Sequence, residues 1–415
     1  MRFSASGLWQ PAAGISGKNF RLRALAASAL VCATPALALF DDRVELWAAE
    51  NATHDTNVLR LSKSVSPASM GVTQLSDTVY TTHLGISANL PVSQQLFLAE
   101  YTRYRSTYQY FKDLDFTGYT ARAHWQWLWG QDKNGTLGYT ASEGLASFNN
   151  IQRNEPDLVT ARQAYFTGNW LVTPRWRATT ALAGTQARHS DPGRTVNDID
   201  AQSAEVGLAY VTPLDNSFGI LTRVEHGRIP HPVQFAGFPL GFDNEYKQYG
   251  IGANTVWMPS PHSRFEGRVE AVRREYQQGT QRNFSGPIVR ALYTWTPTPK
   301  FTLVTSASRD VGPAEDITTS FVLVTGTYIR PRWNVTEKVS LTGDAEYNVW
   351  DYHGDPTVPG GNFRHRVRTF GGKVDYRPTT KILLSAGVNR EVRTSDLPTG
   401  DYAVTVGFVE GRIGF

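Results

Sequence analysis

The last segment of the chain, Asp401 to Phe415, alternates small or apolar residues with polar ones and ends on phenylalanine. Taking every second residue back from the end places Ile413 and Val409 on one face. Glu410 and Arg412 fall on the other. A period of two with one lipid-compatible face is typical of a strand in an outer-membrane β-barrel. A soluble strand can also end this way, so the rest of the sequence has to decide.

Residues 1–38 have the features of a signal peptide. They hold basic but no acidic side chains, then an apolar stretch from Ala24 to Val31, and small residues at Ala36 and Ala38 that predict cleavage after Ala38. The alternative is a membrane anchor, but the apolar run is shorter than the roughly 20 residues that a helical span needs. We therefore expect export of a mature chain that begins at Leu39.

Removing this leader changes what the composition allows. Cys32 lies inside it, so the mature chain has no cysteine and no disulfide, thiol catalysis or cysteine-ligated metal. The net charge of +4 matches the four basic residues of the leader, Arg2, Lys18, Arg21 and Arg23. The mature protein is therefore close to neutral, and no nucleic-acid partner is predicted.

The mature chain, residues 39–415, is predicted to form one all-β domain. It has no linker, charge block or low-complexity segment at which to divide it, and helical periodicity is scarce. Tyr, Trp, Thr, Val and Gly are plentiful, which favours strands. A transmembrane antiparallel β-barrel accounts for both observations.

Short and long connections alternate along the chain. The short ones are mostly Pro-containing turns, at Pro91, Gly130, Pro174, Pro213, Pro259, Pro297, Pro331 and Pro378. The long ones are polar segments around Asp113, Gln152, Asp191, His231, Gly279, Glu315, Gly354 and Ser395. In outer-membrane barrels the tight turns face the periplasm and the longer loops face outward. The count predicts about eighteen strands, or about sixteen if the Val44–Leu61 region is partly periplasmic.

Individual segments predict which face meets lipid. In Arg264–Tyr276, Val269 and its alternate neighbours would point outward, and Glu266 and Glu270 inward. Lys338–Trp350 has the same pattern, with an acidic inner face. A polar inner face distinguishes a water-filled barrel from a soluble sandwich. In the segment Phe363–Tyr376 we expect a β-bulge at Gly371 and Gly372.

Aromatic residues gather beside the short turns, where they predict a periplasmic girdle at the level of the lipid headgroups. They are Trp125, Trp127, Trp129, Trp170, Trp176, Tyr210, Trp257, Tyr293, Trp295, Tyr328 and Tyr376. Eighteen tilted strands close into a cylinder roughly 35 Å across, which side chains alone cannot fill. We therefore expect a water-filled lumen or a plug.

The sequence shows no catalytic or metal-binding motif, so no enzyme activity, cofactor or metal site is predicted. His189 and Ser190 would face opposite sides of a strand, and His226 and His231 flank a loop as surface histidines. The predicted binding wall is a set of inward polar residues: Arg103, Arg105, Arg122, His124, Gln126, Arg223, Glu225, Glu266, Arg268, Glu270, Arg274, Arg290, Asp344, Glu346, Asn389, Glu391 and Arg393. These charges either hold one another in place across strands or form a polar track for a glycan.

The mature N-terminus, Leu39 to Ser62, resembles the start of the EpsL type of outer-membrane barrel proteins, which are encoded with exopolysaccharide genes beside the exosortase system. The likeness rests on Asp41, Asp42 and Arg43 and on the patch Asp55–Leu61. The resemblance implies a part in the production or export of an extracellular polysaccharide by a Gram-negative bacterium. It supplies no catalytic residue.

The sequence thus predicts a barrel of the Gram-negative outer membrane that serves as a passive conduit or docking element for exopolysaccharide. A general or small-solute porin is the alternative, and a structural or adhesive barrel with a lumen blocked by inward loops is a third. The expected partners are outer-membrane lipid, the barrel insertion machinery, the polysaccharide and periplasmic export components. Phe415 is the predicted assembly signal.

Overall fold

The computed structural model describes residues 43–149, 154–231, 245–277, 283–313, 321–353 and 362–415. The predicted signal peptide, with its cleavage site after Ala38, lies outside these residues. So do the predicted loop centres Gln152, Gly279, Glu315 and Gly354. These assignments stay predictions.

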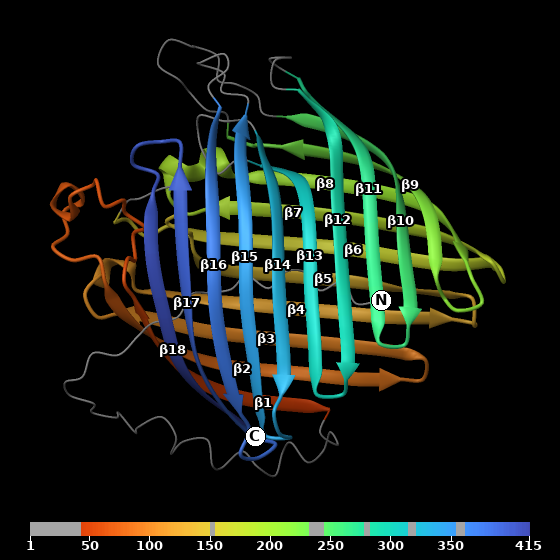
Figure 1. The fold of residues 1–415 in the computed structure, drawn as a ribbon, viewed down its shortest axis with the longest axis horizontal. Coiled ribbons are helices and arrows are strands. Elements are labelled where there is room, and N and C mark those ends of the chain that lie inside the picture. The colour runs from red at the N-terminus through yellow and green to blue at the C-terminus, as the bar shows by residue number, and fades with distance from the viewer. Residues whose placement is uncertain (1–42, 150–153, 232–244, 278–282, 314–320, 354–361) are drawn as a thin grey trace.

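Eighteen antiparallel strands form a closed barrel (Figure 1). Each strand pairs with the next one along the chain, and β1 also pairs with β18, which closes the sheet. The predicted eighteen strands are confirmed, and the alternative of sixteen is wrong because β1 is paired along both edges. The strands are β1 Val44–Asp55, β2 Asp77–Val92, β3 Gln95–Tyr108, β4 Phe116–Trp129, β5 Lys133–Leu145, β6 Leu158–Thr173, β7 Trp176–His189, β8 Ile199–Val211, β9 Ser217–Arg228, β10 Tyr246–Ser260, β11 Ser263–Tyr276, β12 Phe284–Thr298, β13 Phe301–Pro313, β14 Phe321–Asn334, β15 Val339–His353, β16 Phe363–Tyr376, β17 Ile382–Ser395 and β18 Tyr402–Gly414.

The connections differ between the two ends of the barrel. Those that join even-numbered strands to the next odd-numbered strand are tight, as at 93–94, 174–175 and 299–300, and the others are longer. The backbone of Phe415 donates to the carbonyl of Leu46 (2.8 Å), so the C-terminus lies beside the start of β1, at the end with the tight turns. The predicted alternation is confirmed. Because tight turns are periplasmic in outer-membrane barrels, we assign the long connections to the extracellular end, and this orientation stays a prediction.

The predicted faces are confirmed on β11 and β15. On β11, Val269 is 49% exposed on the outside, whereas Glu270 beside it is 1% exposed and forms ion pairs inside. On β15, Leu341 and Tyr347 are exposed outward, and Asp344 and Glu346 pair with a side chain of the inner wall. The barrel therefore has an apolar outer surface and a charged interior. Among the described residues, no helix is long and apolar enough to cross a membrane.

Aromatic side chains form the predicted girdle at the end with the tight turns. Most of the predicted members lie on outward positions, and Trp129, Trp176, Trp257 and Tyr376 are exposed there. Tyr328 is an exception, because it lies on the inward face of β14, where the guanidinium of Arg330 covers its ring at 4.1 Å. The exposed aromatic residue of that strand end is Trp333.

The predicted β-bulge on β16 is wrong. Pairing with β15 runs without interruption through Gly343↔Gly372 and Asp344↔Gly371. Gly371 and Gly372 fit the regular pairing with β15 and with β17, so no extra residue is inserted at this point. With continuous register and Phe370 exposed on the outside, Arg364, Arg366 and Arg368 face outward as well.

Candidate functional site: the barrel lumen

A chain of alternating charges runs across the inner faces of β8, β9, β10 and β11. Arg268 binds Glu205 through both of its terminal nitrogens, the longer contact being 3.1 Å, and binds Glu270 through Nε at 2.6 Å. Glu270 continues to Arg223 (3.5 Å), and Arg223 to Glu225 (3.7 Å). The last member is Arg274, whose Nη2 lies 3.8 Å from Glu225. We call these six residues the charge ladder.

The charge ladder is neutral and largely closed to solvent. Arg274 is 2% exposed, donates to Gln248 (2.9 Å) and lies 4.1 Å above the ring of Tyr246. Buried apolar side chains surround this end of the ladder, among them Val272 and Ile288. Removing charges from water is costly unless each has a partner, and the alternation supplies one. The ladder therefore holds the strands together and leaves little free charge for a solute.

Two smaller ion-pair groups line the wall on the other side of β11. Arg330 on β14 binds Asp344 and Glu346 on β15, the second at 3.1 Å. Arg290 on β12 pairs with Asp310 on β13, and both side chains are half exposed. Arg330 and Glu205 were missing from the predicted wall. Glu266, which was predicted, faces inward and binds Arg264 (2.8 Å).

The sector formed by β3 and β4 differs because its inward charges form no ion pair with any described residue. Arg122 and Glu100 lie opposite each other in the register, both exposed on inward positions, and neither forms an ion pair. His124 binds the hydroxyl of Tyr165 on β6 (2.5 Å), and Gln126 continues the same inward row. This sector offers free charge to a solute.

The inward position predicted for two of the wall residues is wrong. Arg103 and Arg105 are exposed, but they share the face of β3 on which Phe97 and Tyr101 are also exposed, and the alternate residues Thr102 and Tyr104 are buried inside. Both arginines therefore face outward. All the other predicted wall residues lie on inward positions.

The wall of β17 anchors a loop from another part of the barrel. Asn389, Glu391 and Arg393 point inward on this strand, and Glu391 accepts a hydrogen bond from Tyr402. Arg393 donates through Nε to the carbonyl of Gly400 (2.7 Å) and through Nη1 to the carbonyl of Asn149. Asn149 belongs to the connection after β5, on the other side of β18 and β1–β4. The first residues of this connection, up to Asn149, therefore reach from β5 over the extracellular end of the lumen to β17.

The connection between β1 and β2, residues 56–76, also folds inward. We call it the first loop; it lies at the end opposite the tight turns, coloured orange at the left of Figure 1. Its anchor is Arg60, whose φ of 55° is unusual for a residue with a side chain. Its guanidinium binds Asp55 (2.7 Å). Burial lowers the pKa of Arg60, but Asp55, Tyr402 and Glu391 more than offset this, so that its pKa is raised.

An apolar cluster fixes the first loop against the wall. Leu59 and Leu61 are almost completely buried, together with Val79 and Tyr108 from the inner faces of β2 and β3. Leu114 from the connection after β3 joins them, and Leu145 and Phe148, at and just beyond the end of β5, pack against the cluster. The patch Asp55–Leu61, on which the sequence resemblance rests, thus forms the buried base of the first loop against the inner wall.

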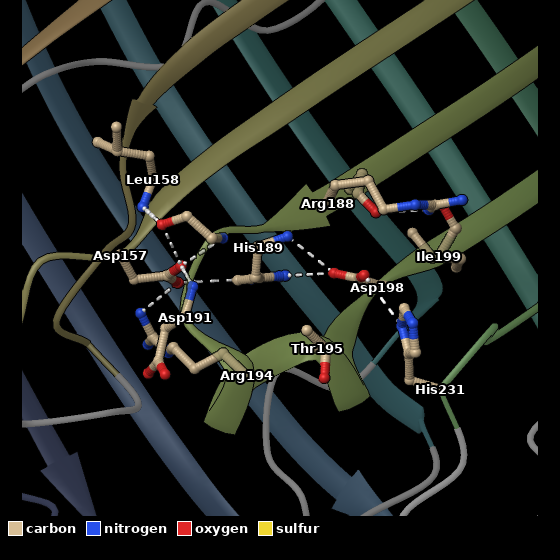
Figure 2. Close-up of polar contacts among 12 residues, drawn as sticks. Asp157, Leu158, Arg188, His189, Asp191, Arg194, Thr195, Asp198, Ile199 and His231 are labelled. Carbon is tan, nitrogen blue, oxygen red and sulfur yellow. Dashed lines mark hydrogen bonds and ion pairs between the residues drawn. The ribbon is translucent and has the colours of Figure 1, made fainter.

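A buried polar cluster ties the neighbouring loops together at the extracellular mouth (Figure 2). Asp157 accepts hydrogen bonds from the backbone of Ser190 and Asp191 (both 3.0 Å) and from Arg194 (2.9 Å). Asp198 accepts from the backbone of His189 (2.8 Å) and contacts its Nδ1 (3.1 Å) and that of an exposed His231 (3.2 Å). This arrangement satisfies two buried carboxylates.

Several histidines at this end of the barrel contact carboxylates. The Ser190 hydroxyl accepts from the backbone of Leu158 (2.8 Å), while the His189 ring contacts the two carboxylates. His226 is half exposed and pairs with Glu245 (2.8 Å). No group of three or more His, Cys, Asp or Glu in the described part of the chain could hold a metal ion.

Comparison with known proteins gives a match to part of the chain. The family described as "Putative beta-barrel porin 2" matches residues 266–415. No curated protein matches. Similar solved structures include the outer membrane protein opdK from Pseudomonas aeruginosa, with 8% identity and a TM-score of 0.46, covering 90% of this chain and 99% of that one. A BenF-like porin from Pseudomonas fluorescens Pf-5 has 9% identity and a TM-score of 0.46. This second match covers 90% of this chain and 99% of the porin's chain.

These observations agree on the nature of the protein. The barrel is closed, its outer surface is apolar with an aromatic girdle at one end, its interior is charged, and its last 150 residues match a porin family. The protein is a porin-like β-barrel of the Gram-negative outer membrane.

Proposed function

We propose that this barrel is a passive channel for small polar solutes, with a path along the β3–β4 sector of the wall. The observation that carries the proposal is the contrast within the lumen. The charge ladder uses its charges internally, whereas Arg122 and Glu100 are exposed inside the barrel and unpaired among the described residues. A polar inner wall with free charges of both signs suits small ions and polar molecules without strong binding.

The inward loops favour a small solute over a polymer. The first loop and the start of the connection after β5, up to Asn149, lie at the extracellular end of the lumen and are held by buried contacts. A glycan chain would have to pass this constriction. The role in exopolysaccharide export that the N-terminal resemblance implies stays a prediction, and the buried position of Asp55–Leu61 gives that patch a structural role.

Conductance in planar lipid bilayers tests the proposal. The purified mature protein should form open channels in simple salt solutions. Arg122→Ala should shift the reversal potential toward cation preference, and Glu100→Gln should shift it toward anion preference. A barrel that folds but conducts no ions would support the structural or adhesive alternative. Conductance that the cognate exopolysaccharide blocks at low concentration would support the glycan conduit.

A further inference from the structure

The outward-facing arginines occupy one level of the barrel. On β16 the outward positions, followed from the periplasmic end, are Tyr376, Val374, Gly372 and Phe370, and then Arg368, Arg366 and Arg364. The change from apolar to basic is abrupt, since Phe370 is 59% exposed and Arg368 follows it on the same face. A charge on the lipid face costs roughly 2–4 kcal/mol at the midplane and about 0–1 kcal/mol near the interface. The change therefore marks the outer edge of the hydrocarbon.

Other strands change in the same way toward their extracellular ends. β3 passes from Phe97 and Tyr101 to Arg103 and Arg105, and β11 from Val269 to Arg273. We call the basic side chains at this level the basic rim. It consists of Arg103, Arg105, Arg162, Arg188, Arg228, Lys247, Arg273, Arg364, Arg366, Arg368 and Arg390. The periplasmic ends of the strands carry the aromatic girdle instead.

The basic rim has more cations than acidic partners. Arg188, Arg273, Arg364 and Arg366 pair with Asp200, Glu275, Asp351 and Asp396. Glu143 and Glu245 are further acidic groups near this level. Arg103, Arg105, Arg162, Arg228, Lys247 and Arg368 form no ion pair with any described residue. The rim therefore keeps cationic groups available to an external anion.

The patch on β3 shows the local chemistry most clearly. Arg103 and Arg105 lie two residues apart on one face, next to the stacked rings of Tyr101 and Tyr119. The acidic side chain in the register row of Arg105 is Glu50, which accepts a hydrogen bond from the Thr82 hydroxyl (2.7 Å). Guanidinium groups bind phosphate oxygens through paired hydrogen bonds, and tyrosines lie at the headgroup level.

We propose that the basic rim binds the phosphate groups of the phosphorylated glycolipid that forms the outer leaflet of the Gram-negative outer membrane. Its level at the edge of the hydrocarbon, its excess of positive charge and the neighbouring tyrosines each match such a headgroup. The glycolipid would hold the barrel at a fixed depth and orientation. This interaction is on the outer surface and is independent of what passes through the lumen.

The test measures binding of lipid A that carries both phosphates, and of the same lipid without phosphates, to the purified mature barrel by native mass spectrometry. The variant removes three unpaired cations, Arg103→Gln, Arg105→Gln and Arg368→Gln, so that no acidic partner is left alone. The matched control removes three exposed cations from periplasmic turns, Lys338→Gln, Arg377→Gln and Lys381→Gln. Heat modifiability checks that each barrel is folded.

We expect the rim variant to bind the phosphorylated lipid on the order of a hundredfold more weakly than the wild type, since each basic residue near a charged surface contributes about 1 kcal/mol. The periplasmic control should bind as the wild type does. Equal losses in both variants, or equal binding of the two lipids by the wild type, would overturn the proposal. If the rim variant does not fold, the proposal is still tested by the wild type, which should bind the phosphorylated lipid more tightly than the lipid without phosphates.

Discussion

The guanidinium of Arg393, on the inner face of β17, donates a hydrogen bond to the backbone carbonyl of Asn149 in the connection after β5. Four strands of the first half of the barrel and β18 separate these residues around the wall. The contact therefore spans the lumen and holds a loop inside it. In the channel that we propose, this contact and the buried base of the first loop would limit the width of the extracellular end.

Releasing this contact should widen the channel. Arg393→Ala removes the donors to Asn149 and Gly400, and the loss of a hydrogen bond to a charged group costs roughly 1.5–3 kcal/mol. We expect a larger single-channel conductance in planar bilayers and a barrel that still folds. Arg390→Ala, on the outer face of the same strand, is the control and should conduct as the wild type does. An unchanged conductance in Arg393→Ala would mean that the loop does not limit the path.

The charge ladder makes a prediction about stability. Glu270→Gln should leave Arg268 and Arg223 without the carboxylate between them, and breaking a buried ion pair in this way costs roughly 3–5 kcal/mol. The measurement is the urea midpoint of unfolding in detergent micelles. Glu100→Gln is the matched control, because Glu100 faces the same lumen without an ion pair, and its midpoint should move little. Equal midpoints for both variants would contradict a structural role of the ladder.

The orientation of the barrel can be checked on β17 and its two connections. An epitope tag inserted after Pro398, beyond the extracellular end of the strand, should be labelled on intact cells. A tag after Thr379, in the tight turn before the strand, should be labelled only when the outer membrane is permeabilised. The reverse pattern would invert the assignment of the two ends and, with it, the level of the basic rim.

The strand number, the turn alternation and most of the inner wall could be predicted from the sequence. A period of two and a tight turn after every second strand repeat many times, and each repeat limits the register of its neighbours. The pairing of Arg268 with Glu205 could not be predicted, since two strands lie between β11 and β8 and only the closed sheet brings these side chains together.

The error at Arg103 and Arg105 has a physical cause. Both residues were assigned to the lumen on the assumption that the charged side chains of a strand point inward along its whole length. That assumption holds in the hydrocarbon but not at the headgroup level, where an outward charge meets phosphate and water. The alternation of side chains along β3 could have revealed that both arginines face outward. Phe97, Tyr101 and Arg103 occupy odd-numbered positions and therefore share one face of the strand.

The loss of folding stability caused by an outward charge should therefore depend on how deep in the membrane the charge lies along one strand. Val269→Arg places a guanidinium on the lipid face near the middle of β11 and should cost roughly 2–4 kcal/mol. Ala271→Arg lies one outward position closer to Arg273 and should cost less, toward the roughly 0–1 kcal/mol found near an interface. Folding titrations into phospholipid vesicles would measure both. If the two variants lose the same stability, the hydrocarbon extends beyond Ala271, and the edge inferred from Phe370 and Arg368 on β16 would have to move outward.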